Sequence, residues 1–225
     1  MERHFTDDLQ DINASILKMA SLTEEAIDLS IQALKDLNVD LARRVIANDT
    51  AIDEMELDIE EKAIDVLALH QPMARDLRFV TTAIGINSNL ERIADLAVNI
   101  CQCVLELSEV KPLLKPLVDI PRLSDLARRM VRRSIDAFVN HDGELAREVI
   151  HMEQQADELR NLIQNELINE YMVIDGKTAP RAVPLLLVAR HLERMCDQAT
   201  NIAENVIYLE QAIVVKHHPE KLRSA

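Results

Sequence analysis

Glycine and aromatic residues are scarce in this chain of 225 residues. It contains three glycines, two tyrosines, three phenylalanines and no tryptophan. A sheet protein of this length needs many turn glycines, so the shortage favours a few long helices. It also excludes a phosphate-binding P-loop and a GxGxxG dinucleotide loop, because both need clustered glycines. Since hydrophobic residues make up 48% of the chain, the expected core is large and aliphatic.

Positive charge, cysteine and long apolar runs are limited as well. The formal net charge of −14 opposes binding to nucleic acid and to anionic lipid, so we expect neither as a partner. No apolar run reaches the ~18 residues of a membrane-spanning helix, and the N-terminal residues lack the apolar segment of a signal peptide. The three cysteines are therefore expected to be free thiols in a reducing cytoplasm.

Apolar residues recur at helical spacing along nearly the whole chain. Asn38 or Asp40 is expected to cap the second helix. The segment 109–121 contains three prolines and is the predicted linker between two halves of the chain. The periodicity predicts six helices, over about 5–37, 38–69, 72–107, 122–140, 142–173 and 180–215.

The two halves also match each other in sequence. An offset of 104 aligns residues 30–46 with 134–150 and brings eight identical residues into register. An offset of 102 aligns residues 90–100 with 192–202 and places Leu90, Glu91, Arg92, Asp95, Asn99 and Ile100 on identical residues. An internal duplication follows, and it predicts two tandem three-helix bundles whose short loops join antiparallel neighbours.

Carboxylates spaced four residues apart occur on the second and third helix of each half, and we call these pairs the acidic motifs. Four-residue spacing places side chains on one face of a helix, and like charges there repel by about 0.2–0.5 kcal/mol. An asparagine follows each third-helix motif by four residues. The candidate ligands are Asp49, Asp53, Glu91, Asp95, Asn99, Glu153, Asp157, Glu193, Asp197 and Asn201.

An acidic face opposite an apolar stripe is ordinarily just a solvated surface. The third helix has such a stripe, made of Ile86, Leu90, Ile93, Ala97, Ile100 and Val104. Four motifs at matching positions of a duplicated unit favour a second interpretation. If the second and third helices of one half adjoin, two carboxylate pairs and an amide oxygen converge, which suits a hard cation.

The ligand types indicate the class of metal. Carboxylate and amide oxygens without histidine suit Mg²⁺, Ca²⁺, Mn²⁺ or iron, and they disfavour structural zinc. Cys196 lies within one motif but is expected in the core. His191 precedes that motif and is interpreted as a surface residue in preference to a group that supports the metal ligands from outside. The motifs contain no Glu-x-x-His sequence, which the di-iron sites of ferritin-like bundles require. No nucleophile–base set is visible either, so the sequence offers little support for a catalytic role.

These motifs are similar to those of the PhoU family, whose members are accessory regulators of phosphate uptake. The segments "LERIADLAVNIC" (90–101), "LERMCDQATNI" (192–202) and "QPMARDLR" (71–78) carry the resemblance, together with "DTAIDEMELDIE" (49–60). Members of the family commonly have glycine before the motif aspartate, where this chain has Ala94 and Cys196. The resemblance covers essentially the whole chain.

The resemblance implies an all-α fold of two tandem pseudo-symmetric three-helix bundles, PhoU-like and spectrin-like, over residues 1–108 and 119–225. It also implies a cytoplasmic protein that forms a homodimer. The acidic motifs would bind divalent or trivalent metal ions, with iron, manganese or magnesium favoured over zinc. The protein would be an adaptor and not an enzyme.

Two partners follow from the same resemblance: the ATPase subunit of the phosphate ABC transporter and a membrane sensor histidine kinase. The adaptor would contact the membrane only through these partners. It would keep the phosphate-starvation response off and restrain uptake when phosphate is sufficient. The alternative is a metal-storage or redox bundle that uses the same motifs for chemistry.

Overall fold

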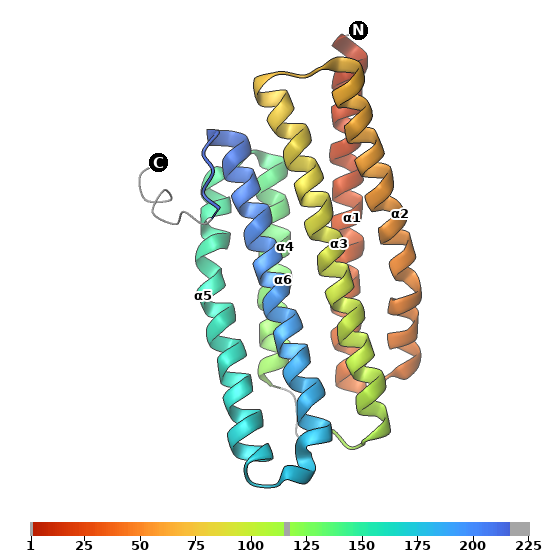
Figure 1. Ribbon diagram of the computed structural model, residues 1–225, viewed down its shortest axis with the longest axis vertical. Coiled ribbons are helices and arrows are strands. Elements are labelled where there is room, and N and C mark those ends of the chain that lie inside the picture. Colours follow the sequence, from red (N-terminus) through yellow and green to blue (C-terminus); the bar gives the residue numbers. More distant parts are fainter. Residues whose placement is uncertain (1, 115–117, 217–225) are drawn as a thin grey trace.

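Six long helices run along the molecule and give it an elongated shape (Figure 1). The computed structural model describes residues 2–114 and 118–216, and these ranges contain no β-strand, which confirms the predicted all-α class. None of the described helices combines the length and apolar content needed to cross a membrane. The α-helices are α1 (Glu2–Asp36), α2 (Val39–His70), α3 (Ala74–Glu109), α4 (Asp119–Asn140), α5 (Gly143–Glu166) and α6 (Ala179–Gln211).

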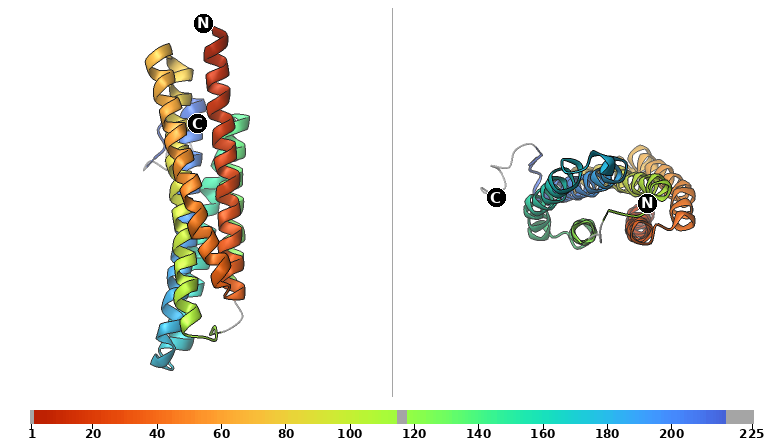
Figure 2. Two further views of the ribbon diagram at one scale, coloured as in Figure 1. Left: turned by 90° about the vertical axis from the view of Figure 1, so that its right-hand side faces the viewer. Right: turned by 90° about the horizontal axis from the view of Figure 1, so that it is seen from below.

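The helices form two three-helix bundles, α1–α3 and α4–α6, as the duplication predicts. Each helix of a bundle packs against the other two, and the bundles meet through α3 against α6 and α1 against α4. Seen end-on, α5, α6, α3 and α2 form one curved row, and α1 and α4 lie on the same side of it (Figure 2). The contact between α3 and α6 is the most extensive between any two helices.

The apolar stripe predicted for the third helix is confirmed, because all six of its side chains are completely buried. Gly85 lies where α3 passes α6. A Cβ atom added there would come within 3.0 Å of the Asn205 side-chain nitrogen. The seam between the two bundles therefore includes a close approach of α3 and α6.

Three boundaries differ from the prediction. The α-helical part of α5 ends at Glu166 and continues as a π-helix (Leu167–Met172), which keeps Leu167 buried against the core. The linker is shorter than expected, because α4 begins at Asp119 and takes Pro121 into its first turn, where proline is tolerated. Within the predicted linker and bundle ranges, residues 1, 115–117 and 217–225 lie outside the described structure.

Side-chain caps begin the second helix of both bundles. Asn38 accepts a hydrogen bond from the Leu41 backbone N–H at 3.0 Å, which confirms Asn38 as the cap of α2. Asp142, which corresponds to Asn38 by the offset of 104, accepts from Glu144 and Leu145 at the start of α5. Both residues satisfy backbone donors that the helix leaves unpaired.

Replacing either cap by alanine should lower the free energy of unfolding by about 1 kcal/mol, or the melting temperature by about 2–4 °C. Thermal unfolding of Asn38→Ala and Asp142→Ala, followed by circular dichroism, measures this loss. Asn48→Ala is the matched control, since Asn48 is exposed within α2. Equal melting temperatures for Asn38→Ala and the control would contradict the capping role.

Candidate metal centre

The acidic motifs of the first bundle lie on adjoining helices, α2 and α3. They form a group with two further carboxylates of α2. We call this group the N-terminal acidic cluster; it consists of Asp49, Asp53, Glu56, Glu60, Glu91 and Asp95. Residues from both helices are close enough to affect one another's protonation, so the packing of α2 on α3 brings the two motifs together.

Burial and mutual repulsion raise the pKa of three carboxyl groups in this cluster. The pKa of Asp49 rises to about 6, through burial first and then through Asp53 and Asp95. The pKa of Glu91 rises to about 7, again through burial first, and then through Asp95 and Glu56. Burial and the neighbouring Glu60 raise the pKa of Glu56 too. Each group thus favours a proton or another cation beside it.

The acidic motifs of the second bundle meet in the same way between α5 and α6. We call Glu153, Asp157, Glu193 and Asp197 the C-terminal acidic cluster. Burial and then Glu193 raise the pKa of Asp197 to about 6. Burial and then Asp157 raise the pKa of Glu153. Here, however, a guanidinium lies between the helices: Arg160 contacts both Asp157 and Glu193.

The two predicted asparagine ligands lie on the same helices as the third-helix motifs. Asn99 and Asn201 are half-buried one turn beyond the third-helix motifs, and no hydrogen bond joins either of them to a carboxylate of the clusters within residues 2–114 and 118–216. In the same ranges, no group of three or more His, Cys, Asp and Glu side chains has an arrangement that holds a metal ion. The ligand assignments therefore stay predictions.

Glu56 and Glu60 belong to the acidic stripe that the sequence places on the second helix with Asp49 and Asp53, although they were not among the predicted ligands. Sequence reasoning missed Arg160. The spacing of residues in the sequence does not indicate that Arg160 would contact Asp157 and Glu193. The expectation for Cys196 is confirmed, since its side chain is completely buried. His191 lies half-buried in α6, and burial, followed by the charge of Arg194, lowers the pKa of its ring.

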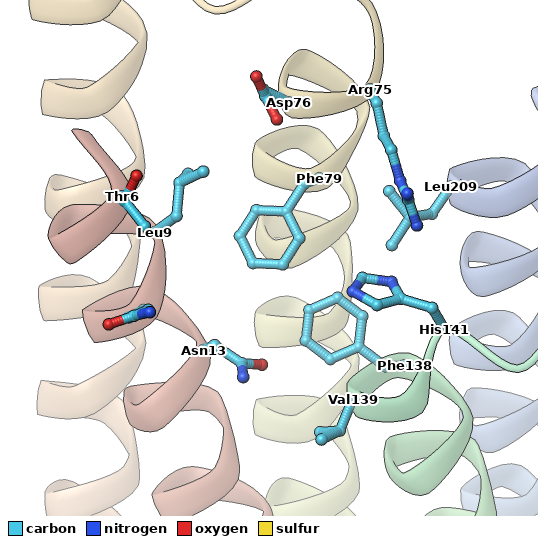
Figure 3. Close-up of a pocket in the computed structure, with 11 residues that line it drawn as sticks. Thr6, Leu9, Asn13, Arg75, Asp76, Phe79, Phe138, Val139, His141 and Leu209 are labelled. Carbon is cyan, nitrogen blue, oxygen red and sulfur yellow. The ribbon is translucent and has the colours of Figure 1, made fainter. Parts of the chain in front are cut away.

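A separate cavity of about 340 Å³ lies at one end of the joint between the bundles (Figure 3). Phe79 of α3 and Phe138 of α4 stack there with ring centroids 5.6 Å apart. At its rim, Glu210 of α6 accepts hydrogen bonds from Arg75 and pairs with His141. None of the predicted ligands lines this cavity, so it is separate from the acidic clusters.

The donor chemistry of the acidic clusters fits a hard cation. Every candidate donor is a carboxylate or amide oxygen, the ligand type of Mg²⁺, Ca²⁺, Mn²⁺ and iron. Crowding already destabilises the ionised form of several of these groups. A bound cation would relieve that repulsion without a proton. The buried thiols, whose pKa values are raised by burial, are unsuited to nucleophilic or ligand roles.

Known proteins resemble this chain along most of its length. A family model described as the PhoU domain matches residues 16–104 and again 120–206, one match in each bundle. A phosphate-specific transport system accessory protein PhoU homolog from Aquifex aeolicus is 41% identical over 210 residues, covering 93% of this chain and 94% of the relative. Homolog 2 from Thermotoga maritima is 35% identical over 222 residues, covering 99% and 94%.

Solved structures agree with these relationships. The crystal structure of PhoU from Pseudomonas aeruginosa superposes with a TM-score of 0.89 at 32% identity, covering 93% of this chain and 100% of that one. The phosphate transport system regulatory protein PhoU from Streptococcus pneumoniae gives a TM-score of 0.87 at 28% identity, covering 94% and 99%. Family model, relatives and fold all coincide, and the chain belongs to the PhoU family.

Proposed function

We propose that this protein is a non-enzymatic cytoplasmic regulator of phosphate uptake whose two acidic clusters bind metal ions. The names of its relatives, which are accessory proteins of phosphate-specific transport systems, support the first part. One observation supports the second part most directly: in both bundles, carboxylates from neighbouring helices lie within electrostatic range of each other. Iron, manganese or magnesium would be the ions, with zinc less suited to oxygen-only ligands.

The proposed partners are the ATPase subunit of the phosphate ABC transporter and a sensor histidine kinase. By linking them, the protein would restrain uptake and hold the starvation response off when phosphate is sufficient. An adaptor needs a rigid shape and a surface that partners can recognise. The six packed helices supply the shape, and the two acidic clusters supply charged surfaces for recognition. We further propose that it acts as a homodimer, which light scattering of the purified protein measures directly.

Removal of the third-helix motifs should weaken partner binding. We expect the fourfold variant with Glu91, Asp95, Glu193 and Asp197 replaced by alanine to lose at least tenfold in affinity for the kinase or the ATPase subunit. Capture of each purified partner on a biosensor measures this. The matched control replaces four exposed carboxylates outside the clusters, Glu54, Asp65, Glu106 and Glu170.

Equal loss of affinity in the test and control variants would show that total negative charge matters and the clusters do not. Retention of full affinity in both would contradict the proposal that the clusters serve partner binding. Turnover with oxygen, or uptake of many ions per chain, would instead favour the storage or redox alternative.

The metal-free protein should become less stable as the pH rises. The pKa values of Asp49 and Glu91 are about 6 and 7 in the folded chain, above the ordinary 3.8 and 4.5. The folded state therefore binds more protons than the unfolded state between about pH 4 and 7, and this stabilisation is lost as the pH rises through the folded-state pKa values. We expect the melting temperature to fall from pH 5 to pH 8.

Glu91→Gln should make the free energy of unfolding fall less between pH 5 and pH 8, by about 0.5–1 kcal/mol after allowance for solvent screening. Added Mn²⁺ should raise the melting temperature of the unmodified protein at pH 8. Differential scanning calorimetry in chelator-treated buffer measures both effects. Glu106→Gln, an exposed residue outside the clusters, should behave like the unmodified protein. A melting temperature that rises from pH 5 to pH 8 would contradict the predicted repulsion.

A further inference from the structure

The first helix of the chain is longer than its counterpart in the second bundle. By the offset of 104 that relates α1 to α4, the start of α4 corresponds to Ser15. Residues 2–14 of α1 therefore form an extension that the duplicated scaffold does not require. Two contacts hold this extension against the end of α2. The Phe5 and His70 rings lie 5.1 Å apart between centroids, and Asp8 Oδ2 lies 2.9 Å from His70 Nε2.

The cavity between the two bundles (Figure 3) owes one of its walls to this extension. Every residue of α1 that lines it belongs to residues 2–14, namely Thr6, Leu9, Gln10 and Asn13. The remaining lining comes from α3, from α6 and from the end of α4, so the cavity borders both bundles. Its volume of about 340 Å³ lies within the range of small-molecule sites, roughly 300–1,000 Å³.

Aromatic side chains are rare in this chain, and two of them line this cavity. The whole sequence has three phenylalanines, two tyrosines and no tryptophan. Phe79 and Phe138 stack on each other in the cavity wall. By the offsets of 102 and 104 they correspond to Arg181 and Leu34, so the duplicated scaffold packs without aromatic rings at these positions. Phe138 is buried and Phe79 is half-buried, so the stack can accept a further flat molecule at the Phe79 ring.

Three polar side chains at this cavity are unpaired. Within residues 2–114 and 118–216, no side-chain hydrogen bond or ion pair joins Gln10, Asn13 or Asp76 to another group of the protein. A carboxamide both donates and accepts hydrogen bonds, and it pairs at two points with the amino and ring nitrogens of adenine. The Asp76 carboxylate accepts from an amino group. These groups together suit a flat nitrogen heterocycle that carries an amino group.

The two basic side chains at the rim of the cavity are already engaged. Arg75 Nη2 donates to both carboxylate oxygens of Glu210, at 3.1 and 3.0 Å, and His141 Nδ1 lies 2.8 Å from Glu210 Oε1. A phosphate or carboxylate group on a ligand would have to displace Glu210, and it would also meet the negative charge of Asp76. The cavity therefore favours an uncharged ligand over an anion.

We propose that this cavity binds a small, uncharged, amino-substituted nitrogen heterocycle of the class of the purine nucleosides. The flat ring stacks on Phe79, and the carboxamides of Gln10 and Asn13 pair with its edge. Because the ligand contacts both bundles at once, its binding stabilises their arrangement. The site is separate from the acidic clusters and does not depend on metal binding.

Isothermal titration of the full-length protein with adenosine and with guanosine tests the proposal. The unmodified protein should bind at least one of them with a dissociation constant on the order of 0.1 mM, and that nucleoside should raise the melting temperature. Asn13→Leu, which removes the amide at similar side-chain volume, should weaken binding by about tenfold or more. Asn165→Leu is the matched control, since Asn165 is exposed on α5, and it should bind like the unmodified protein.

The preference for an uncharged ligand has its own test. The 5′-monophosphate of the nucleoside should bind the unmodified protein about tenfold more weakly than the nucleoside does. Glu210→Gln frees the Arg75 guanidinium for a phosphate and should bring the two affinities to within about threefold. Circular dichroism of each variant without ligand establishes that it folds. If Asn13→Leu does not fold, Gln10→Leu repeats the test at an exposed position of the same extension.

Failure of both nucleosides to bind the unmodified protein would overturn the proposal. Equal affinity in the amide variant and the unmodified protein would overturn it too, because the nucleoside would then bind elsewhere. Tighter binding of the monophosphate than of the nucleoside would contradict the uncharged ligand. Binding of naphthalene as tightly as the nucleoside would show that the cavity selects apolar surface and does not recognise the edge of a heterocycle.

Discussion

The burial of α3 and α6 on nearly all sides is the constraint on which the rest of this structure depends. Each packs against the two other helices of its bundle and against its counterpart across the seam. A narrow strip of each helix remains at the surface, and on it lie Glu91 and Asp95, or Glu193 and Asp197. Neither helix can rotate to separate these carboxylates from those of α2 or α5 without exposing completely buried side chains such as Ile93 and Leu192. The crowding of charge is thus enforced by the core.

The duplicated scaffold allows its two copies to diverge at the surface while the interior stays equivalent. The caps Asn38 and Asp142 correspond in position and in hydrogen bonding. The side chains beside the acidic motifs do not correspond in charge, because the anion Glu56 is matched at the offset of 104 by the cation Arg160. A fold of this kind supports two sites of related geometry and unequal charge, which a protein with a single bundle could not offer.

Much of this architecture could be predicted from the sequence, because helical periodicity marks the buried face of each helix. The six-residue stripe of α3, the cap at Asn38 and the division into two bundles needed no further information. The periodicity does not determine which surface residues of neighbouring helices meet, since that depends on how the helices rotate and slide against each other. Arg160 was missed for this reason. So was the pairing of Phe79 with Phe138, residues that lie in different bundles.

Local context explains the remaining differences. The chain continues past α5 as a π-helix over Leu167–Met172, with Leu167 buried in the core. No residue pattern in the sequence predicted this π-helix. His191 lies half-buried because it precedes the α6 motif on a helix with little exposed surface. In both places, tertiary packing decides what the local sequence leaves open.

The most direct test of the central claim, that the crowded carboxylates hold metal, is elemental analysis of the protein purified without chelators. The account predicts at least one iron, manganese or magnesium ion per chain in the unmodified protein, lost in the variant with Glu91, Asp95, Glu193 and Asp197 replaced by alanine. Metal-free protein in both samples, or an equal metal content in both, would contradict it.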